Sequence, residues 1–246
     1  MAGKRRVYMN WSGGKDSAMC LYEALQDRTM EVYSLLTSLN AAHDRVSMHG
    51  VRRSLLEAQA RSIGLPLRTI ELPEHPDMPY YETAMHRAVQ ALGVEGCTGA
   101  LFGDIFLEDL RQYREKQLRE AGMDCFFPLW KKDSAVLARE CIRMGFKAVV
   151  VCVNDRRLDK SFCGRLYDEA FLRDLPAGVD PCGENGEFHS FVFDGPIFRS
   201  PIAFTPGQIV YRQYQAPRVS QREANLEEAY GFYFCDLLSP EAGLRP

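Results

Sequence analysis

The stretch Asn10–Met19 reads NWSGGKDSAM and joins two segments of different pattern. The segment before it, Arg6–Trp11, is short, apolar and rich in residues that favour β-strands, whereas the apolar residues after Gly14 recur at helical spacing. The sequence therefore predicts a strand, a glycine turn and a helix. Such a turn presents backbone N–H groups and the positive end of a helix dipole, which together bind anions, usually phosphates.

The side chains of this turn favour a polyphosphate. Two glycines allow close approach of the backbone, two hydroxyls add donors, and a lysine supplies a mobile positive charge. The turn is not a Walker A loop, because that pattern requires glycine where Met9 stands and serine or threonine where Asp16 stands. A glycine pair alone is also consistent with relief of strain in a βα turn, but six consecutive residues of these types favour phosphate binding. The candidate phosphate-binding residues are Ser12, Gly13, Gly14, Lys15, Asp16 and Ser17.

Strands and helices continue to alternate after the turn. Expected strands cover Glu31–Leu39, Leu67–Leu72, Gly99–Gly103 and Lys147–Val153, and expected helices cover Val51–Ile63, Tyr81–Leu92, Glu108–Ala121 and Ser134–Met144. Strands rich in valine and leucine, separated by helices, predict a doubly wound α/β fold with a mostly parallel sheet. Ligands bind at the carboxyl ends of such strands, so we expect the turns after Trp11, Leu39 and Gly103 to meet at one site.

The pattern changes after about Leu175. Glycine, proline and alternating apolar residues replace the helical period, and the segments Ile209–Gln215 and Tyr230–Leu238 are typical of extended chain. We therefore predict a smaller, strand-rich C-terminal lobe. The expected division is a nucleotide-binding domain over residues 1–155 and a substrate-binding lobe over residues 156–246.

The composition limits the classes of partner. A formal net charge of -3 gives no whole-protein attraction to nucleic acid. The eight cysteines include no C-x-x-C pair, and neither a signal segment nor an apolar run of about 18 residues is found. We expect a cytoplasmic protein with reduced thiols, and neither a membrane nor a nucleic acid as its partner.

A second group of chemically active residues lies in GENGEFHS, residues Gly183–Ser190. Either Glu184 or Glu187 is suited to bind an ammonium ion or to orient an acceptor, and His189 is suited to move a proton near neutral pH. For this segment by itself, a polar hairpin turn with a solvated histidine stays open as the alternative.

Two aspartates near the expected strand ends have two interpretations each. Asp104, in the GDI sequence that begins at Gly103, faces the nucleotide or a magnesium ion through water, or it caps the following helix. Asp16 lies near metal-bound phosphates, or it stabilises the helix dipole. His43 and His49 receive no role, because a lone histidine is more often a surface polar residue.

The six residues SGGKDS resemble the pyrophosphate loop of the N-type ATP pyrophosphatases, a group that includes asparagine synthetase, GMP synthetase and the tRNA-thiolating enzymes. The resemblance implies an adenine nucleotide alpha hydrolase-like fold. It also implies that ATP, with Mg²⁺ on its phosphates, is cleaved between the α and β phosphates, giving AMP and pyrophosphate.

Three longer segments, Met48–Leu67, Leu101–Trp130 and Asp159–Phe198, are similar to the diphthine–ammonia ligase family. Enzymes of that family use ATP and ammonia to amidate the carboxylate of diphthine, a modified histidine of translation elongation factor 2. The resemblance implies an ATP-dependent amide ligase whose acceptor carboxylate belongs to a protein residue or a small molecule. A tRNA-modifying enzyme and a non-catalytic ATP sensor are the alternatives.

The same resemblance implies roles for residues outside the glycine turn. Implied catalytic residues are Glu184, Asn185, Glu187 and His189, and implied nucleotide-binding residues are Gly103 and Asp104. Residues implied to bind substrate are Gly164, Arg165, Gly183 and Gly186. The chain departs from the family in one segment. The family commonly has G-E-G-G-E, an aromatic residue and then E-T, whereas this chain has Asn185 at the third position and His189 and Ser190 at the last two.

Overall fold

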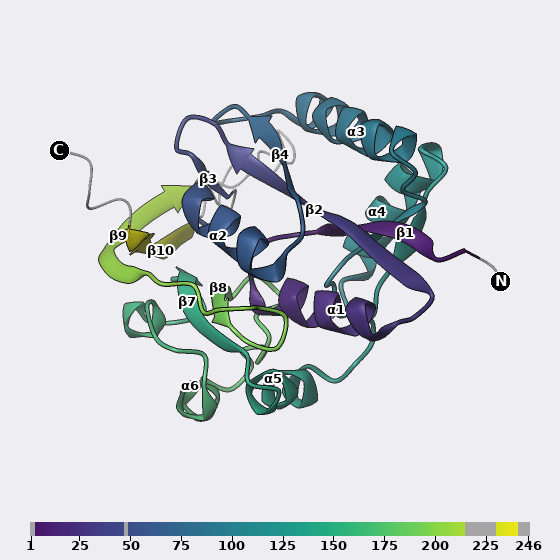
Figure 1. Ribbon diagram of the computed structural model, residues 1–246. Coiled ribbons are helices and arrows are strands. Elements are labelled where there is room, and N and C mark those ends of the chain that lie inside the picture. The colour runs from purple at the N-terminus through teal and green to yellow at the C-terminus, as the bar shows by residue number, and fades with distance from the viewer. Residues whose placement is uncertain (1–2, 47–48, 215–229, 241–246) are drawn as a thin grey trace.

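The computed structural model describes residues 3–46, 49–214 and 230–240 (Figure 1). Six strands form the first sheet: β1 (Arg5–Asn10), β2 (Met30–Asn40), β3 (Arg45–Val46), β4 (Leu67–Leu72), β5 (Gly99–Leu101) and β6 (Asp124–Phe126). Their order is β3-β2-β1-β5-β6, and β4 pairs with β2. All these pairs are parallel except β2 with β3. The prediction of a mostly parallel sheet is therefore confirmed.

Helices cover both faces of this sheet. Helices α1 (Lys15–Gln26) and α2 (Arg53–Ile63) pack on one face, and α3 (Met78–Val94) and α4 (Glu108–Glu120) pack on the other (Figure 1). The alternation within β1 explains the two layers, because Val7 and Met9 are buried with α1 whereas Tyr8 is buried with α3 and α4. The fold is thus a doubly wound α/β fold, as predicted.

A second, antiparallel sheet lies beside the first. It contains β7 (Lys147–Asn154), β8 (Phe188–Asp194), β9 (Thr205–Tyr214) and β10 (Tyr230–Leu238), in the order β8-β7-β10-β9. The helices near it are α5 (Ser134–Arg143), a 3₁₀ turn over Lys160–Phe162, and α6 (Glu169–Asp174). The strand-rich second lobe is therefore confirmed. Gln215, the last residue of one expected extended segment, lies outside the described residues.

The position of β7 corrects one expectation. We expected Lys147–Val153 to continue the parallel sheet, but β7 pairs with β8 and β10 in antiparallel orientation. Its residues Ala148–Val153 are all buried, so an uninterrupted apolar run did not distinguish the two kinds of sheet. The division after residue 155 stays a prediction.

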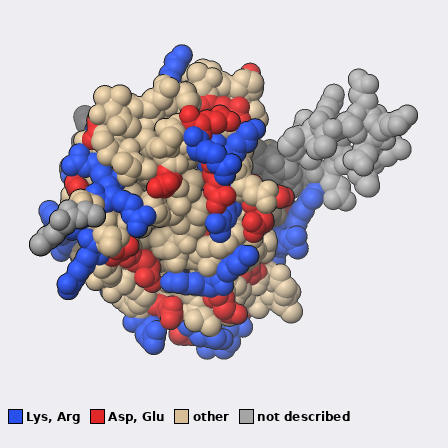
Figure 2. Space-filling view, turned by 90° about the vertical axis from the view of Figure 1, so that its right-hand side faces the viewer, with Lys and Arg blue, Asp and Glu red and all other residues tan. Residues whose placement is uncertain are grey.

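The surface carries charges of both signs. Figure 2 shows Lys and Arg side chains interspersed with Asp and Glu side chains over one face of the molecule. Among the described residues, no helix is both long enough and apolar enough to cross a membrane.

Candidate functional site

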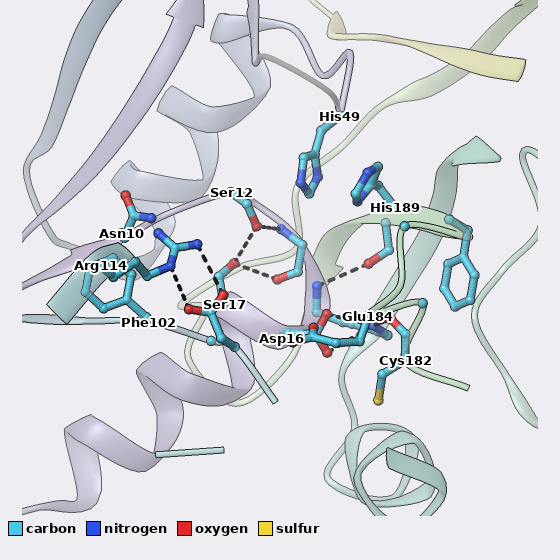
Figure 3. Close-up of a pocket in the computed structure, with 18 residues that line it drawn as sticks. Asn10, Ser12, Asp16, Ser17, His49, Phe102, Arg114, Cys182, Glu184 and His189 are labelled. Carbon is cyan, nitrogen blue, oxygen red and sulfur yellow. Dashed lines mark hydrogen bonds and ion pairs between the residues drawn. The ribbon is translucent and has the colours of Figure 1, made fainter. Parts of the chain in front are cut away.

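A cavity lies at the carboxyl ends of β1 and β5, where the first sheet meets the second (Figure 3). Its walls come from the glycine turn, from Phe102–Asp104 after β5, from Arg114 of α4, from His49, and from the segment 182–190. The turns after β1 and β5 thus meet, as expected. The turn after β2 does not line this cavity, and its Asn40 side chain instead bonds the backbone of residues 42 and 43.

The glycine turn is closely packed. Gly13 has a φ of 79°, and a Cβ atom there would lie 2.7 Å from a Leu56 methyl carbon, so glycine is required. The backbone N–H of Gly14 donates to the Ser12 hydroxyl at 3.2 Å, and the Ser17 hydroxyl donates to the Gly14 carbonyl at 2.8 Å. The two hydroxyl oxygens are 3.1 Å apart. The turn therefore presents fixed donors at the start of α1.

Residues of β8 in the second sheet and of α2 form hydrogen bonds with the backbone of the turn. The backbone N–H of Val192 in β8 donates to the Gly13 carbonyl at 2.9 Å. The amide of Gln59, a fully buried side chain of α2, donates to the Gly13 carbonyl at 3.0 Å and to the Val192 carbonyl at 2.6 Å. The shape of the turn therefore depends on both lobes. Gln59 was not among the site residues predicted from the sequence.

Lys15 is held in place rather than mobile. Its ammonium donates to both carboxylate oxygens of Asp16, at 2.9 and 2.8 Å, and to the Cys182 carbonyl, and it lies over the rings of Tyr167 and Phe188 at 5.3 and 5.4 Å. Burial disfavours the charged ammonium, but the Asp16 carboxylate outweighs this effect, and the pKa of Lys15 is raised. The expectation of a mobile positive charge was wrong, because residues of the second lobe cover this side chain.

Asp104 faces the cavity in an ion pair. Its carboxylate lies 2.7 Å from Nε of Arg114, whose guanidinium carbon is 4.4 Å from the centre of the Phe102 ring. Burial raises the pKa of Asp104, and Arg114 opposes that shift. Helix α4 begins after Leu107 without a side-chain cap, so the helix-cap interpretation of Asp104 was wrong. At Gly103 a Cβ atom would lie 2.9 Å from the Asp16 backbone, which explains the glycine.

Glu184 is the carboxylate of the second lobe that lines the cavity. Its Oε1 accepts hydrogen bonds from the backbone N–H groups of Ile105 at 2.7 Å and Phe106 at 3.4 Å. Burial raises the pKa of Glu184 to about 7, the two N–H groups oppose this shift, and Asp16 and Asp104 add to it. A carboxyl group with this pKa exchanges protons readily at neutral pH.

Glu187 is buried and does not line the cavity. Its Oε1 accepts hydrogen bonds from the Asp180 backbone N–H and from the Asn185 amide, both at 3.1 Å. Gly183 and Gly186 have positive φ angles of 70° and 80° within the same turn. Glu187 and Asn185 therefore shape the segment that carries Glu184.

His189 and His49 form a stacked pair at the cavity. Their ring centroids are 4.3 Å apart and the ring planes differ by 29°. Burial and the Lys15 ammonium lower the pKa of His189 to about 4. Burial and His189 hold the pKa of His49 well below its usual value. His189 is thus not the solvated histidine of a hairpin turn. His49 is a residue that sequence reasoning left unassigned, although it lies within a family-like segment.

Gly164 and Arg165 do not line the cavity. The guanidinium of Arg165 donates to Asp174 at 2.7 Å and lies over the Phe162 ring at 5.2 Å. Gly164 has a φ of 85° and packs near Cys235. Their role in substrate binding stays a prediction.

The cysteines do not form a reactive pair. All eight are free, and seven of them are buried. Cys182 lines the cavity, but burial raises the pKa of its thiol, which donates to the Ser134 carbonyl at 3.3 Å. A protonated, hydrogen-bonded thiol is a poor nucleophile.

Comparisons with known proteins identify the family of the chain. The model of the diphthamide synthase N-terminal domain matches residues 5–125, and that of the C-terminal domain matches residues 133–220. A diphthine–ammonia ligase of Danio rerio is 28% identical over 78% of this chain and 83% of its own length. Those of Bos taurus and Homo sapiens are 25% and 23% identical, covering 83% and 86% of this chain and 85% and 87% of their own lengths. The chain belongs to the diphthine–ammonia ligase-like family and is an ATP-dependent ligase.

Proposed function

We propose that this protein adenylates an acceptor carboxylate with ATP and transfers ammonia to it, releasing AMP and pyrophosphate. One observation carries the proposal. At the start of α1, the backbone N–H of Gly14 donates to the Ser12 hydroxyl, and the backbone N–H of Lys15 donates to the Ser190 hydroxyl, both at the cavity. Both donors are therefore directed at oxygen atoms. Phosphate oxygens are stronger acceptors than hydroxyls because they are charged.

In the first step an acceptor carboxylate oxygen attacks the α phosphorus of ATP. The bond between the α phosphorus and the bridging oxygen breaks, and the electron pair leaves with pyrophosphate. The N–H groups of the turn and the dipole of α1 stabilise the negative charge that develops on the leaving group. Lys15 contributes by its position, because it ties Asp16 to the Cys182 carbonyl and so joins the turn to the second lobe.

In the second step ammonia attacks the carbonyl carbon of the acyl-adenylate. Ammonium must first lose a proton, and Glu184 is our candidate acceptor because its pKa is about 7 and it lines the cavity. The new carbon–nitrogen bond forms, the carbon–oxygen bond to AMP breaks, and the nitrogen releases its further proton to water.

The Mg²⁺ expected with ATP would be carried by the phosphates. Among the described residues, no group of three His, Cys, Asp or Glu side chains can hold a metal ion. Asp16 and Asp104 line the cavity, but each already pairs with a cationic side chain. Magnesium keeps several waters and needs only one or two carboxylates beside phosphates, so these residues fit a water-mediated contact. Its contribution would be to neutralise phosphate charge.

The acceptor is best sought among carboxylates related to diphthine. The relatives are named for diphthine, whereas His189 and Asn185 replace a glutamate and a glycine common in the family. The full chain would be incubated with ATP, MgCl₂, ammonium chloride and elongation factor 2 that carries diphthine, and in parallel with small carboxylic acids. Hydroxylamine in place of ammonium would trap an acyl-adenylate as a hydroxamate.

We expect AMP and pyrophosphate in equal amounts, together with an amidated acceptor. ADP and orthophosphate as the only products with an acceptor that is converted would refute the proposal. AMP formation with a small acid but not with elongation factor 2 would place the acceptor outside proteins and leave the reaction class unchanged.

A further inference from the structure

His49 approaches the phosphate-binding turn from the segment between β3 and α2. A Cβ atom on Gly14 would lie 3.5 Å from Cε1 of His49, so the imidazole is next to the turn. Figure 3 shows His49 and His189 side by side beside Ser12. His49 lines the cavity together with the turn and with His189. Any molecule that reaches the N–H groups of the turn therefore also lies beside this imidazole.

A carboxylate of the second sheet binds arginines on both sides of His49. Asp236 of β10 accepts hydrogen bonds from Arg45 at 2.8 Å and from Arg52 at 2.9 and 2.6 Å, one arginine on each side of His49 in the sequence. Arg45 also donates to the Gly50 carbonyl at 2.7 Å. Arg52 binds the carboxylate with two hydrogen bonds, a bidentate pair of defined geometry, and Arg45 adds one bond. Residues on both sides of His49 are therefore joined to the second sheet.

The Nδ1 atom of His49 is buried and has no hydrogen-bond partner among the described residues. Most buried polar atoms in proteins have a partner, so this nitrogen has capacity for a molecule that enters the cavity. Its surroundings keep the imidazole neutral: burial, His189 and Lys15 lower the pKa of His49, and they outweigh a hydrogen bond to the Ser190 backbone that raises it. The carboxylates of Asp16 and Glu184 face the same cavity. A polyanion placed beside the ring would favour its protonated form.

We propose that His49 is a ligand of the nucleotide phosphates, which takes a proton from solvent and donates a hydrogen bond to a phosphate oxygen when ATP enters the cavity. The inference rests on the proposed function, because it requires ATP in this cavity. His189 supports the His49 ring by stacking against it. ATP binding is then coupled to the uptake of up to one proton.

Calorimetry with ATP and MgCl₂ tests the inference. Titrations between about pH 6 and 7, around the ordinary histidine pKa, in two buffers of different ionisation enthalpy give the number of protons taken up. The test variant is His49→Gln, which keeps an amide donor but cannot be protonated. The matched control is His43→Gln, because His43 is exposed, pairs with Glu74 at 2.9 Å and lies outside the cavity.

We expect proton uptake in the wild-type protein and in His43→Gln. His49→Gln is expected to lose this uptake and to bind ATP about tenfold more weakly. Spectra of the wild-type chain with ¹⁵N-labelled histidine provide a second measurement that needs no stable variant. The chain has five histidines, and the His49 signals are expected to move from the neutral to the protonated form when ATP is added.

Unchanged affinity and proton uptake in a folded His49→Gln variant would overturn the inference, as would histidine spectra in which His49 stays neutral with ATP bound. Gly14→Ala separates this failure from failure of the proposed function. A Cβ there would lie 3.1 Å from the Ser190 carbonyl and would disturb the turn. If Gly14→Ala loses ATP binding while His49→Gln does not, only the role of His49 fails. If the wild-type protein binds no ATP, both fail.

Discussion

Replacing Gln59 by leucine tests whether α2 holds the glycine turn in shape. Gln59 is fully buried, and its Oε1 accepts a hydrogen bond from the Trp11 indole at 3.0 Å while its Nε2 donates to Gly13 and Val192. Leucine fills a similar volume but makes none of these bonds. The Gly13 carbonyl keeps its bond from the Val192 N–H, whereas the Trp11 N–H and the Val192 carbonyl lose the glutamine. Each of these two unpaired buried groups costs about 1–3 kcal/mol, so we predict a loss of about 2–6 kcal/mol in the free energy of unfolding.

Urea denaturation followed by circular dichroism measures this loss. The slope of the free energy of unfolding against urea concentration is expected to stay the same. The matched control is Gln90→Leu on the exposed side of α3, which is expected to change the free energy of unfolding by less than about 0.5 kcal/mol. Adding Trp11→Phe to Gln59→Leu removes the unpaired indole N–H and should restore about 1 kcal/mol. A loss below about 1 kcal/mol in Gln59→Leu would refute the reasoning.

Four other variants test the site. Lys15→Met should weaken ATP binding in calorimetry and lower the free energy of unfolding by about 3 kcal/mol, because it leaves the Asp16 carboxylate unpaired; stability equal to wild type would contradict this. Glu187→Gln should bind ATP normally but lower AMP formation with an active acceptor, because Glu187 shapes the segment that carries Glu184; weakened ATP binding with normal turnover would contradict this. Glu184→Gln should abolish the rise in AMP release that the wild-type enzyme shows as pH increases through about 7; an unchanged pH profile would rule out the proton-transfer role. Burial raises the pKa of Asp236, but hydrogen bonds from two arginines outweigh burial and lower this pKa to about 2. The carboxylate therefore stabilises the fold above about pH 4, and this stabilisation is lost as the pH falls through about 2. In urea titrations Asp236→Asn should therefore be less stable than wild type at neutral pH, with a difference that shrinks between about pH 4 and 2.

Patterns within a short segment of the sequence were enough to predict those elements that form through interactions between neighbouring residues. The β1 strand, the glycine turn and α1 follow from β-propensity, paired glycines and helical spacing within about 20 residues. The three-residue strand β6 was not expected, because so short a strand shows no period. The sheet to which β7 belongs also escaped prediction, since a fully buried strand is apolar on both faces in either sheet.

The candidate site was predicted only where the residues in contact lie within one segment of the sequence. Lys15 was expected to be mobile because nothing near it in the sequence shows that the Cys182 carbonyl, 167 residues away, covers its ammonium. Gln59 lies at helical spacing from the buried Leu55 and Leu56, and a polar residue on that apolar face was an available signal of a buried hydrogen bond. His49 gave no such signal, because its stacking partner lies in the second lobe.

The bond between the backbone N–H of Lys15 and the hydroxyl of Ser190 joins residues 175 positions apart. A ribosome makes the chain from its N-terminus, so the glycine turn leaves the exit tunnel long before β8 has been synthesised. During that interval the turn lacks the partners that give it its shape. If the turn binds ATP as proposed, a nascent chain would not hold the nucleotide, and ATP in the cell would stabilise only chains whose synthesis has passed β8. The abundance of ATP would then favour chains that contain β8 over shorter ones, without any dedicated quality-control contact.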